Sequence, residues 1–228
     1  ALTLWLLPLL ALVAFLYASV GHAGASGYIA VLALAGLPAE QIKPLALILN
    51  TAVAAQGSWQ FWRAGHLRWR LFWPVLLAGL PMAFLGGWLD LPTLWFQRLV
   101  ALVLLASALR FLCQPGDPER LKQPPLILLV LSGAGLGLLA GLTGTGGGVF
   151  LTPLLLGCSW ASTRQAAAVS SLFIFGNSLS GLAGLLLARQ PSGALPSQLG
   201  WMLLIVLLAG AVGSRLGSRH WPVAWIRR

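Results

Sequence analysis

Two glycine-rich stretches decide the fold, Gly21-His22-Ala23-Gly24-Ala25-Ser26-Gly27 and Gly141-Leu142-Thr143-Gly144-Thr145-Gly146-Gly147-Gly148. Each is followed by a short apolar segment, 28–38 after the first stretch and 148–158 after the second. Eleven helical residues cover about 16 Å, near half of a hydrocarbon core of about 30 Å. The sequence therefore predicts a half-helix after each glycine-rich stretch.

The rest of the chain is a series of longer apolar runs. Of its 228 residues, 58% are hydrophobic and only 8% charged, which is far from the composition of a soluble protein. Runs long enough to cross a bilayer are bounded by charge, Pro or Gly. The predicted full spans are 3–20, 44–62, 71–89, 96–113, 125–141, 165–188 and 198–214. We expect an all-α polytopic protein of the cell inner membrane, without a soluble domain.

The glycines indicate an internal duplication. Those at 21, 24 and 27 recur at 141, 144 and 147, a constant offset of 120 residues. With one residue inserted, the alignment of the two copies continues and pairs Asn50 with Ser171 and Gln56 with Asn177. We predict a first transmembrane repeat over 1–113 and a second over 125–228. The second lacks a counterpart of the last span of the first, so we expect a further span of about 18 residues to follow Arg228.

The basic residues favour one orientation of the two copies. If each half-helix were a re-entrant hairpin returning to the side it came from, basic residues would divide seven and seven between the faces. If each glycine stretch and its half-helix complete one crossing, the division is eleven to three, as the positive-inside rule requires. Each copy then crosses five times, which predicts inverted repeats whose half-helices meet near the midplane.

The glycine stretches predict a binding site for a small anion. Backbone amides at a helix N-terminus carry the positive end of the helix dipole, and two such ends meeting would bind an oxyanion without a formal charge. The alternative for the glycines is close helix packing, and for the polar side chains it is interhelical hydrogen bonding. Thr51, Ser170 and Ser178 lie near the candidates. The candidate substrate-binding residues are Gly24, Ser26, Gly27, Asn50, Gln56, Thr143, Gly144, Thr145, Gly146, Gly147, Gly148, Ser171 and Asn177.

Titratable groups restrict the transport mechanism. All four acidic residues fall in predicted loops, whereas carriers of cations use carboxylates inside the membrane. His22 is the one histidine in a predicted crossing, so it is the candidate for proton coupling, with a structural role as the alternative. The two cysteines follow no metal-ligand spacing, and we expect no metal and no cofactor. The 14 Lys and Arg residues are scattered between spans, which argues against nucleic-acid binding.

Both glycine motifs resemble those of the sulfite exporter TauE/SafE family of membrane transporters. The resemblance is carried by Gly144 to Pro153, by Gly21 to Tyr28, by Ile42-Lys43-Pro44 to Asn50 and by the duplication. It implies a secondary transporter for sulfite, sulfoacetate or a related sulfur-containing anion. The first motif differs from the second in having Ser26 and Tyr28 where the second has Gly146 and Gly148.

Other functions remain open from the sequence. An anion channel or a membrane scaffold would have the same composition, and a homodimer fits it as well as a monomer does. Gly24-Ala25-Ser26-Gly27 also resembles the Gly-x-Ser-Gly of rhomboid intramembrane serine proteases, with Ser26 as nucleophile. Such a site needs a histidine from another span to accept the serine proton, and no later predicted span contains one. We therefore expect a carrier and not an enzyme.

Overall fold

The computed structural model describes residues 5–89, 91–112, 118, 120–188 and 197–220. Over this part of the chain the regular structure is entirely helical, as predicted. The helices are α1 (Leu6–Ser19), α2 (Ala25–Leu34), α3 (Ala39–Arg63), α4 (Trp69–Trp88), α5 (Thr93–Leu112), α6 (Leu126–Thr143), α7 (Gly148–Gly157), α8 (Thr163–Ala188) and α9 (Leu199–Arg215), which continues as a π-helical turn, η1 (Leu216–His220).

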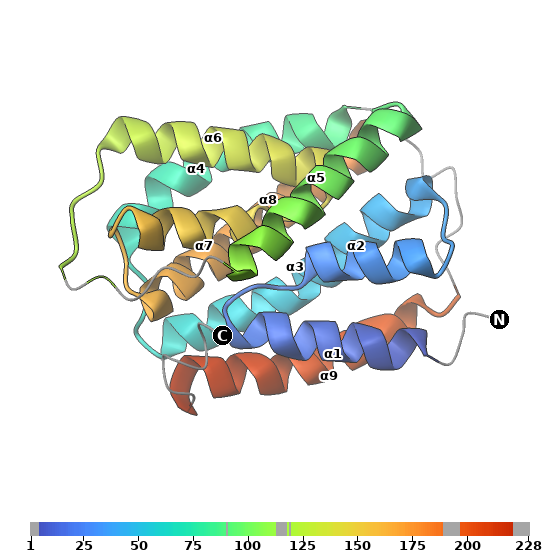
Figure 1. Cartoon of the computed structure of the whole chain (residues 1–228), viewed down its shortest axis with the longest axis horizontal. Coiled ribbons are helices and arrows are strands. Elements are labelled where there is room, and N and C mark those ends of the chain that lie inside the picture. The colour runs from blue at the N-terminus through green and yellow to red at the C-terminus, as the bar shows by residue number, and fades with distance from the viewer. Residues whose placement is uncertain (1–4, 90, 113–117, 119, 189–196, 221–228) are drawn as a thin grey trace.

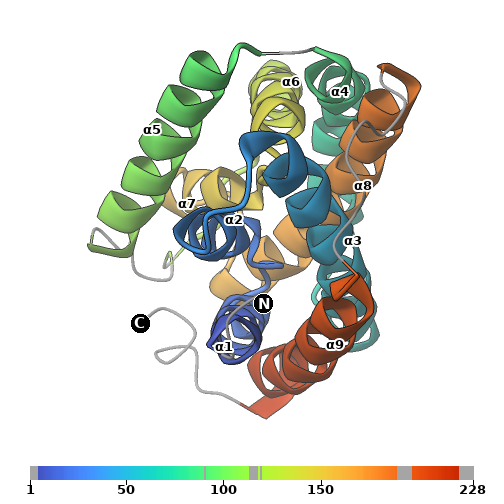
Figure 2. The same cartoon turned by 90° about the vertical axis from the view of Figure 1, so that its right-hand side faces the viewer.

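The helices form one bundle along a common axis, with α5 crossing the others obliquely (Figure 1). By length and composition α4, α6, α8 and α9 extended to Arg219 can cross a membrane. Viewed along the axis, α2 and α7 lie in the interior with the longer helices around them (Figure 2). The chain is therefore a multi-pass membrane protein with two short helices inside its bundle.

The two predicted half-helices are present but begin at different places relative to their glycines. Both have 10 residues, and the first begins at Ala25, three residues before the predicted 28. Their N-caps, Gly24 and Gly147, are 123 residues apart and both have positive φ, 101° and 76°. The offset of 120 residues is therefore wrong as the register of the helix starts. The second glycine turn begins later than the alignment of Gly21 with Gly141 predicts, because Gly141 still belongs to α6.

The predicted span 3–20 is also corrected. Within the described residues α1 has 14 residues, about 21 Å of helix, and it ends at a glycine turn that is buried inside the bundle. The chain then reverses, since a Cβ at Gly27 in α2 would lie 2.5 Å from the Val13 side chain in α1. Together α1 and α2 enter and leave on the same end of the bundle (Figure 1).

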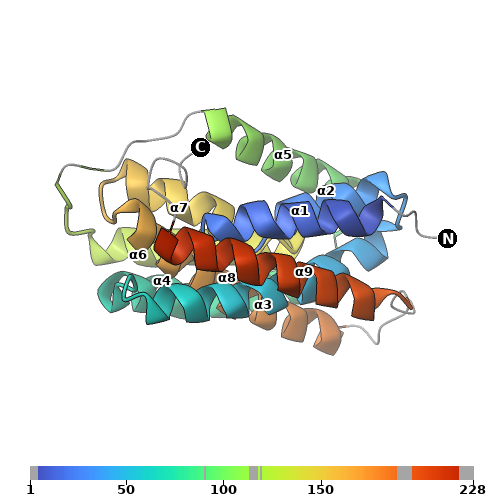
Figure 3. The same cartoon turned by 90° about the horizontal axis from the view of Figure 1, so that it is seen from below.

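Glycines make the closest helix contacts. Gly133, Gly137 and Gly141 form one face of α6, and a Cβ on any of them would meet the backbone of α4. On α9, a Cβ at Gly213 would meet the carbonyl oxygen of Phe15 in α1. Figure 3 shows α1 and α9 lying side by side. Small residues at these positions let backbones approach, as is typical of membrane helices. The tightest packing therefore joins the first part of the chain to the second.

The ends of the bundle differ in charge. Lys43 Nζ donates to the carbonyl of Gly86 at 3.1 Å, which joins the start of α3 to the end of α4. At the other end Arg68 donates to the carbonyl of Trp160 at 2.9 Å. We call this second end the basic end. It carries Arg63, Arg68, Arg70, Arg120, Lys122, Arg164, Arg215 and Arg219. Arg189, Arg227 and Arg228 lie outside the described residues. Which end is cytoplasmic, and the inverted repeat itself, stay predictions.

Candidate functional site

The two glycine segments meet inside the bundle. Gly21 to Ser26 and Thr143 to Gly148 are buried. The second segment also reverses the chain, because a Cβ at Gly147 would lie 2.9 Å from the carbonyl oxygen of Leu136 in α6. From these turns α2 runs to the end opposite the basic end and α7 runs to the basic end (Figure 1). Both half-helices thus begin in the protein interior.

The N-terminus of α2 is capped from another helix. Neither Gly24 nor Gly147 provides a side-chain cap, and first-turn amides have no acceptor within their own helix. The amide of Ala25 instead donates to Asn50 Oδ1 at 3.2 Å. Asn50 is fully buried in α3. In this structure its oxygen satisfies the first half-helix, and an anion at this amide would have to displace it.

Asn50 also connects the first half-helix to the second glycine segment. Its Nδ2 donates to Ser178 Oγ in α8 at 2.8 Å. A Cβ at Gly146 would lie 3.0 Å from Ser178 Oγ and would contact Asn50 Nδ2. The structure therefore brings the predicted residues Gly146 and Asn50 together, with Ser178 as their shared neighbour.

His22 makes a second connection between the glycine segments. Its Nδ1 lies 3.1 Å from the carbonyl oxygen of Val20, and its Nε2 lies 3.1 Å from that of Gly148 and 3.2 Å from Thr152 Oγ1. Thr152 donates in turn to Ser170 Oγ at 2.8 Å. Neutral imidazole has one N–H, so it can donate to only one of the two carbonyls, whereas imidazolium can donate to both. This geometry gives each protonation state its own hydrogen-bond pattern.

Thr152 was missed in the sequence reasoning. It is buried and lies in the first turns of α7, where the pattern Thr152-Pro153 looks like part of an apolar segment. A single hydroxyl in an apolar run gives little signal by itself, since hydroxyls in membrane helices often bond to their own backbone. Its contacts with His22 and Ser170 become visible only once α7 is placed beside α8.

Asn177 has the most unusual environment of the predicted residues. Its side chain is fully buried in α8, and neither Oδ1 nor Nδ2 has a hydrogen-bond partner. It faces Gly79 in α4, where a Cβ would lie 2.9 Å from Oδ1. One turn earlier in α8 is Phe173, and its ring would lie 3.1 Å from a Cβ at Gly147. The unpartnered amide therefore faces α4, one helical turn from a residue that contacts the second glycine segment.

Other predicted residues point elsewhere. Ser26 Oγ donates to the Tyr17 hydroxyl at 3.1 Å, and Ser171 Oγ accepts from Ser58 Oγ at 3.4 Å. Gln56 faces α9, because a Cβ at Gly210 would lie 3.7 Å from its Oε1. The hydroxyls of Thr143 and Thr145 are 2.9 Å apart. Gly24, Gly27, Gly144, Gly147 and Gly148 all line or adjoin the buried turns. The predicted set is thus divided between a central group around Asn50 and several separate contacts.

Metal binding has no support in the described part of the chain. No group of three or more His, Cys, Asp and Glu residues gathers there. Around Asn50 and His22, where the two glycine segments meet, the described polar atoms are those of amides, hydroxyls, the His22 imidazole and backbone carbonyls. Amides and hydroxyls can donate hydrogen bonds to an anion.

Two comparisons with known proteins give the same kind of relative. The profile of the "Sulfite exporter TauE/SafE" family matches residues 6–228. The chain is 39% identical over 220 residues to the "Probable membrane transporter protein y4hK" of Sinorhizobium fredii (strain NBRC 101917 / NGR234), covering 94% of this chain and 88% of that protein. No solved structure matches. The chain is a multi-pass protein of the cell inner membrane, and it belongs to the TauE/SafE sulfite exporter family.

Proposed function

We propose that this protein is a secondary transporter that moves a small sulfur-containing anion, such as sulfite or sulfoacetate, across the cell inner membrane. The observation that carries the proposal is the meeting of two buried glycine segments inside the bundle, together with the buried amide of Asn177 in the adjoining helix α8, which has no partner in the protein. A buried polar group without a partner is costly and needs an explanation. An oxyanion accepting from Asn177 Nδ2 would supply one.

The site binds through dipoles instead of formal charge. Gly147 opens α7, so the first-turn amides of this helix point into the interior with the positive end of its dipole. Thr143 and Thr145 add hydroxyls beside the same turn. The proposed contacts on this side are Asn177 and the segment Thr143 to Gly148. Lys43 adjoins this segment, since a Cβ at Gly144 would lie 3.6 Å from its Cγ, but its ammonium group donates to the carbonyl of Gly86. An anion held by amides and hydroxyls alone is bound weakly enough to be released, as a carrier requires.

The first half-helix contributes after a rearrangement. Asn50 covers the amide of Ala25, so the proposed contacts at Gly24, Ser26 and Gly27 form only when the Asn50 side chain moves. We propose that the repeats over 1–113 and 125–228 are inverted and that they rock around the glycine segments, which opens the site to one end and then to the other. In this scheme Gln56 and Ser171 lie on the helices that move, away from the bound anion.

The test is transport in proteoliposomes of the purified protein. Sulfite, thiosulfate, sulfoacetate and sulfate are compared, with protein-free liposomes as the blank. We expect at least one of the sulfur anions to be taken up with saturation, and to accumulate against its own gradient when a driving ion gradient is present. Flux that never saturates and only runs downhill would identify a channel. If no sulfur anion moves and none raises thermal stability, the proposed substrate class is wrong.

A further inference from the structure

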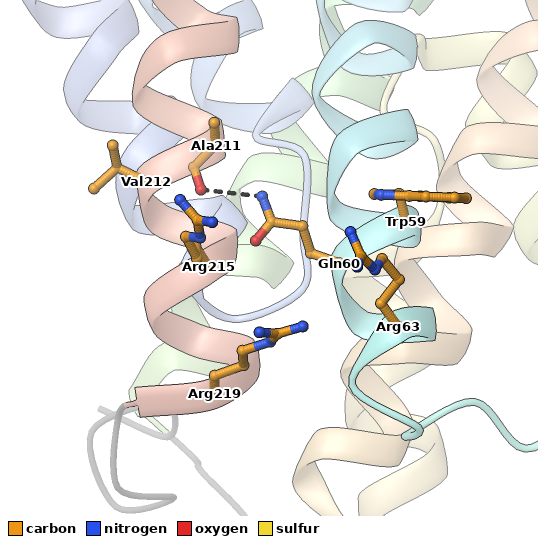
Figure 4. A pocket seen from close by; sticks show the side chains of 7 residues that line it. All are labelled: Trp59, Gln60, Arg63, Ala211, Val212, Arg215 and Arg219. Atoms are coloured by element: carbon orange, nitrogen blue, oxygen red, sulfur yellow. Dashed lines mark hydrogen bonds between the residues drawn. The ribbon is translucent and has the colours of Figure 1, made fainter.

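A cluster of arginines lies far from the glycine segments, at the basic end. A cavity of about 340 Å³ opens between α3 and α9 (Figure 4). Trp59, Gln60 and Arg63 line it from α3, and Ala211, Val212, Arg215 and Arg219 from α9 and η1. Three guanidinium groups therefore share one opening.

The cavity has charge but no counter-charge in its walls. No Asp or Glu is among its lining residues in the described part of the chain. Arg219 reaches from η1 toward α3, whereas the Arg215 side chain lies over α9 (Figure 4). Gln60 Nε2 donates to the carbonyl of Ala211 at 3.2 Å, which holds the two helices together at the inner limit of the opening. Three cations in one opening repel one another, and an anion between them would relieve that repulsion.

The side chains that line the cavity are of the types found at the depth of the lipid headgroups. Arg63 Cζ lies 5.8 Å from the centre of the Trp59 ring. Trp59 is 54% exposed, and Trp62 and Trp69 are exposed close by. Tryptophans and arginines in this combination are typical of the membrane interface, where an indole lies at headgroup depth. A ligand held here would reach both headgroups and acyl chains.

An apolar groove adjoins the cavity. Its volume is about 280 Å³, and it shares Trp59 with the basic cavity. The other lining residues are Ala55, Ser58, Trp62, Leu67, Trp69, Leu172 and Phe175. A free inorganic anion would gain no binding energy from an apolar surface. A ligand that is anionic at one end and apolar at the other fits both parts.

We infer that this region binds an anionic phospholipid. The phosphate lies between Arg63, Arg215 and Arg219, and an acyl chain lies over Trp59 and along the groove toward Trp62 and Phe175. Basic pockets between membrane helices suit anionic headgroups, and a zwitterionic lipid would gain much less from three arginines. The site is separate from the proposed substrate site, and its occupation is expected to stabilise the contact between α3 and α9.

The test measures lipid binding to the delipidated, detergent-purified protein by native mass spectrometry and by thermal stability. The probes are dioleoylphosphatidylglycerol, dioleoylphosphatidylcholine and inorganic phosphate. We expect the phosphatidylglycerol to bind and stabilise, and the other two to have little effect. The triple variant R63Q/R215Q/R219Q should lose about a hundredfold in phosphatidylglycerol affinity, since each basic residue contributes about fivefold near an anionic lipid.

The matched control removes the same charge from the same end. In R70Q/R120Q/K122Q we expect phosphatidylglycerol affinity within about threefold of the wild type, since these residues lie outside the cavity. Trp62→Gln, at an exposed position of the groove, should weaken lipid binding about fivefold without changing stability in detergent. If the triple variant misfolds, the single variant Arg219→Gln gives the same comparison with about a fivefold loss.

Two results would overturn the inference. Equal phosphatidylglycerol affinity in the triple variant and the wild type would mean that the three arginines do not hold the headgroup. Stabilisation by inorganic phosphate that matches the lipid, together with no effect of Trp62→Gln, would assign the cavity to a free oxyanion. Neither result depends on the transport assay, so the inference and the proposed function are tested separately.

Discussion

Asn50 and Ser178 are 128 residues apart in the chain, and their side chains share a buried hydrogen bond of 2.8 Å from Asn50 Nδ2 to Ser178 Oγ. Through its other amide atom Asn50 accepts from the Ala25 amide. One side chain thus ties α2, α3 and α8 together beside the second glycine segment.

This relationship predicts unequal effects of two truncations. Asn50→Ala removes both bonds and leaves the Ala25 amide without its partner, so we expect a loss of about 1–3 kcal/mol in unfolding free energy. Ser178→Ala removes one interhelical bond and should cost about 0.6 kcal/mol. Unfolding in mixed micelles measures both. Equal losses would show that the bond to the Ala25 amide contributes nothing, and no coupling between the two sites in the double variant would show the same of the bond to Ser178.

His22 is expected to link transport to pH. Its two ring nitrogens face the carbonyls of Val20 and Gly148, and only the protonated ring can donate to both. If a proton accompanies the anion, His22→Gln should flatten the pH dependence of uptake between about pH 5.5 and 7.5. His220→Gln, at the basic end, is the control. A pH profile identical to the wild type would assign His22 to structure alone.

His66 is expected to make the stability of the fold, and not transport, depend on pH. Burial and, more weakly, the nearby Arg164 lower the pKa of His66 from its ordinary value of 6.5, while its bond to the carbonyl of Ser218 opposes this shift. The folded protein then binds this proton less readily than the unfolded chain, so stability falls as pH drops through the unfolded value. We expect His66→Gln to lose less thermal stability than the wild type between about pH 7.5 and 5.5. A larger loss in the variant would contradict the sign.

The helices and the half-helices could be predicted because hydropathy and glycine clustering are local signals. The start of α2 could not, because Ala25 and Ser26 look like part of the turn until the left-handed Gly24 is seen to end it. That α1 ends inside the bundle could not be predicted either. Apolar composition continues up to Ser19, but the turn that follows lies within the bundle and not at its far end.

The sequence predicted the chemical types of the residues at the candidate site, but it predicted the positions of only some of them. Amides and hydroxyls near the glycines were expected, and Gly146 and Asn50 lie together at the buried turns, whereas Asn177 faces α4. The alignment of Gln56 with Asn177 did not indicate that Gln56 faces α9. Which face of a helix meets the site depends on helix rotation, which packing determines and a sequence offset does not.

The glycines themselves are poor probes of binding. Alanine at Gly147 would be strained, because φ is 76° there and the added Cβ would lie 2.9 Å from the carbonyl oxygen of Leu136. If the Gly147→Ala variant no longer bound the anion, the cause could therefore be misfolding as well as the loss of an amide contact. At Gly210 the only close contact of the new Cβ would be the Val53 side chain at 2.9 Å, which can move. Polar side chains give a cleaner test than the turn.

Orientation in the membrane is predicted from charge. In a variant without its native cysteines, single cysteines at positions 66 and 120 should react with an impermeant maleimide only from the cytoplasm, and one at position 92 only from outside. The reason is that most of the described basic residues gather at the end that holds 66 and 120. Labelling of 66 and 92 from the same side would rule out the proposed topology and with it the inverted repeat.

The unpartnered amide of Asn177 predicts that stability and transport change in opposite directions. Asn177→Leu keeps most of the side-chain volume and removes two buried polar atoms that have no protein partner. Replacing such a group by an apolar one of similar shape is neutral or stabilising, by up to about 1 kcal/mol. Without the amide the site loses a hydrogen-bond donor to the anion, so we expect uptake to fall about tenfold or more.

Leucine at Ser178 is not a suitable comparison, because it would collide with Gly146. The control is therefore Ser180→Ala, which removes a hydroxyl from the same helix that bonds to the carbonyl of Leu80 at 2.7 Å. We expect this variant to lose a little stability and keep its transport. Unfolding in micelles and uptake in proteoliposomes are measured on the same preparations. If Asn177→Leu destabilises the protein by more than about 1 kcal/mol and transports as well as the wild type, the amide serves the fold and the anion binds elsewhere.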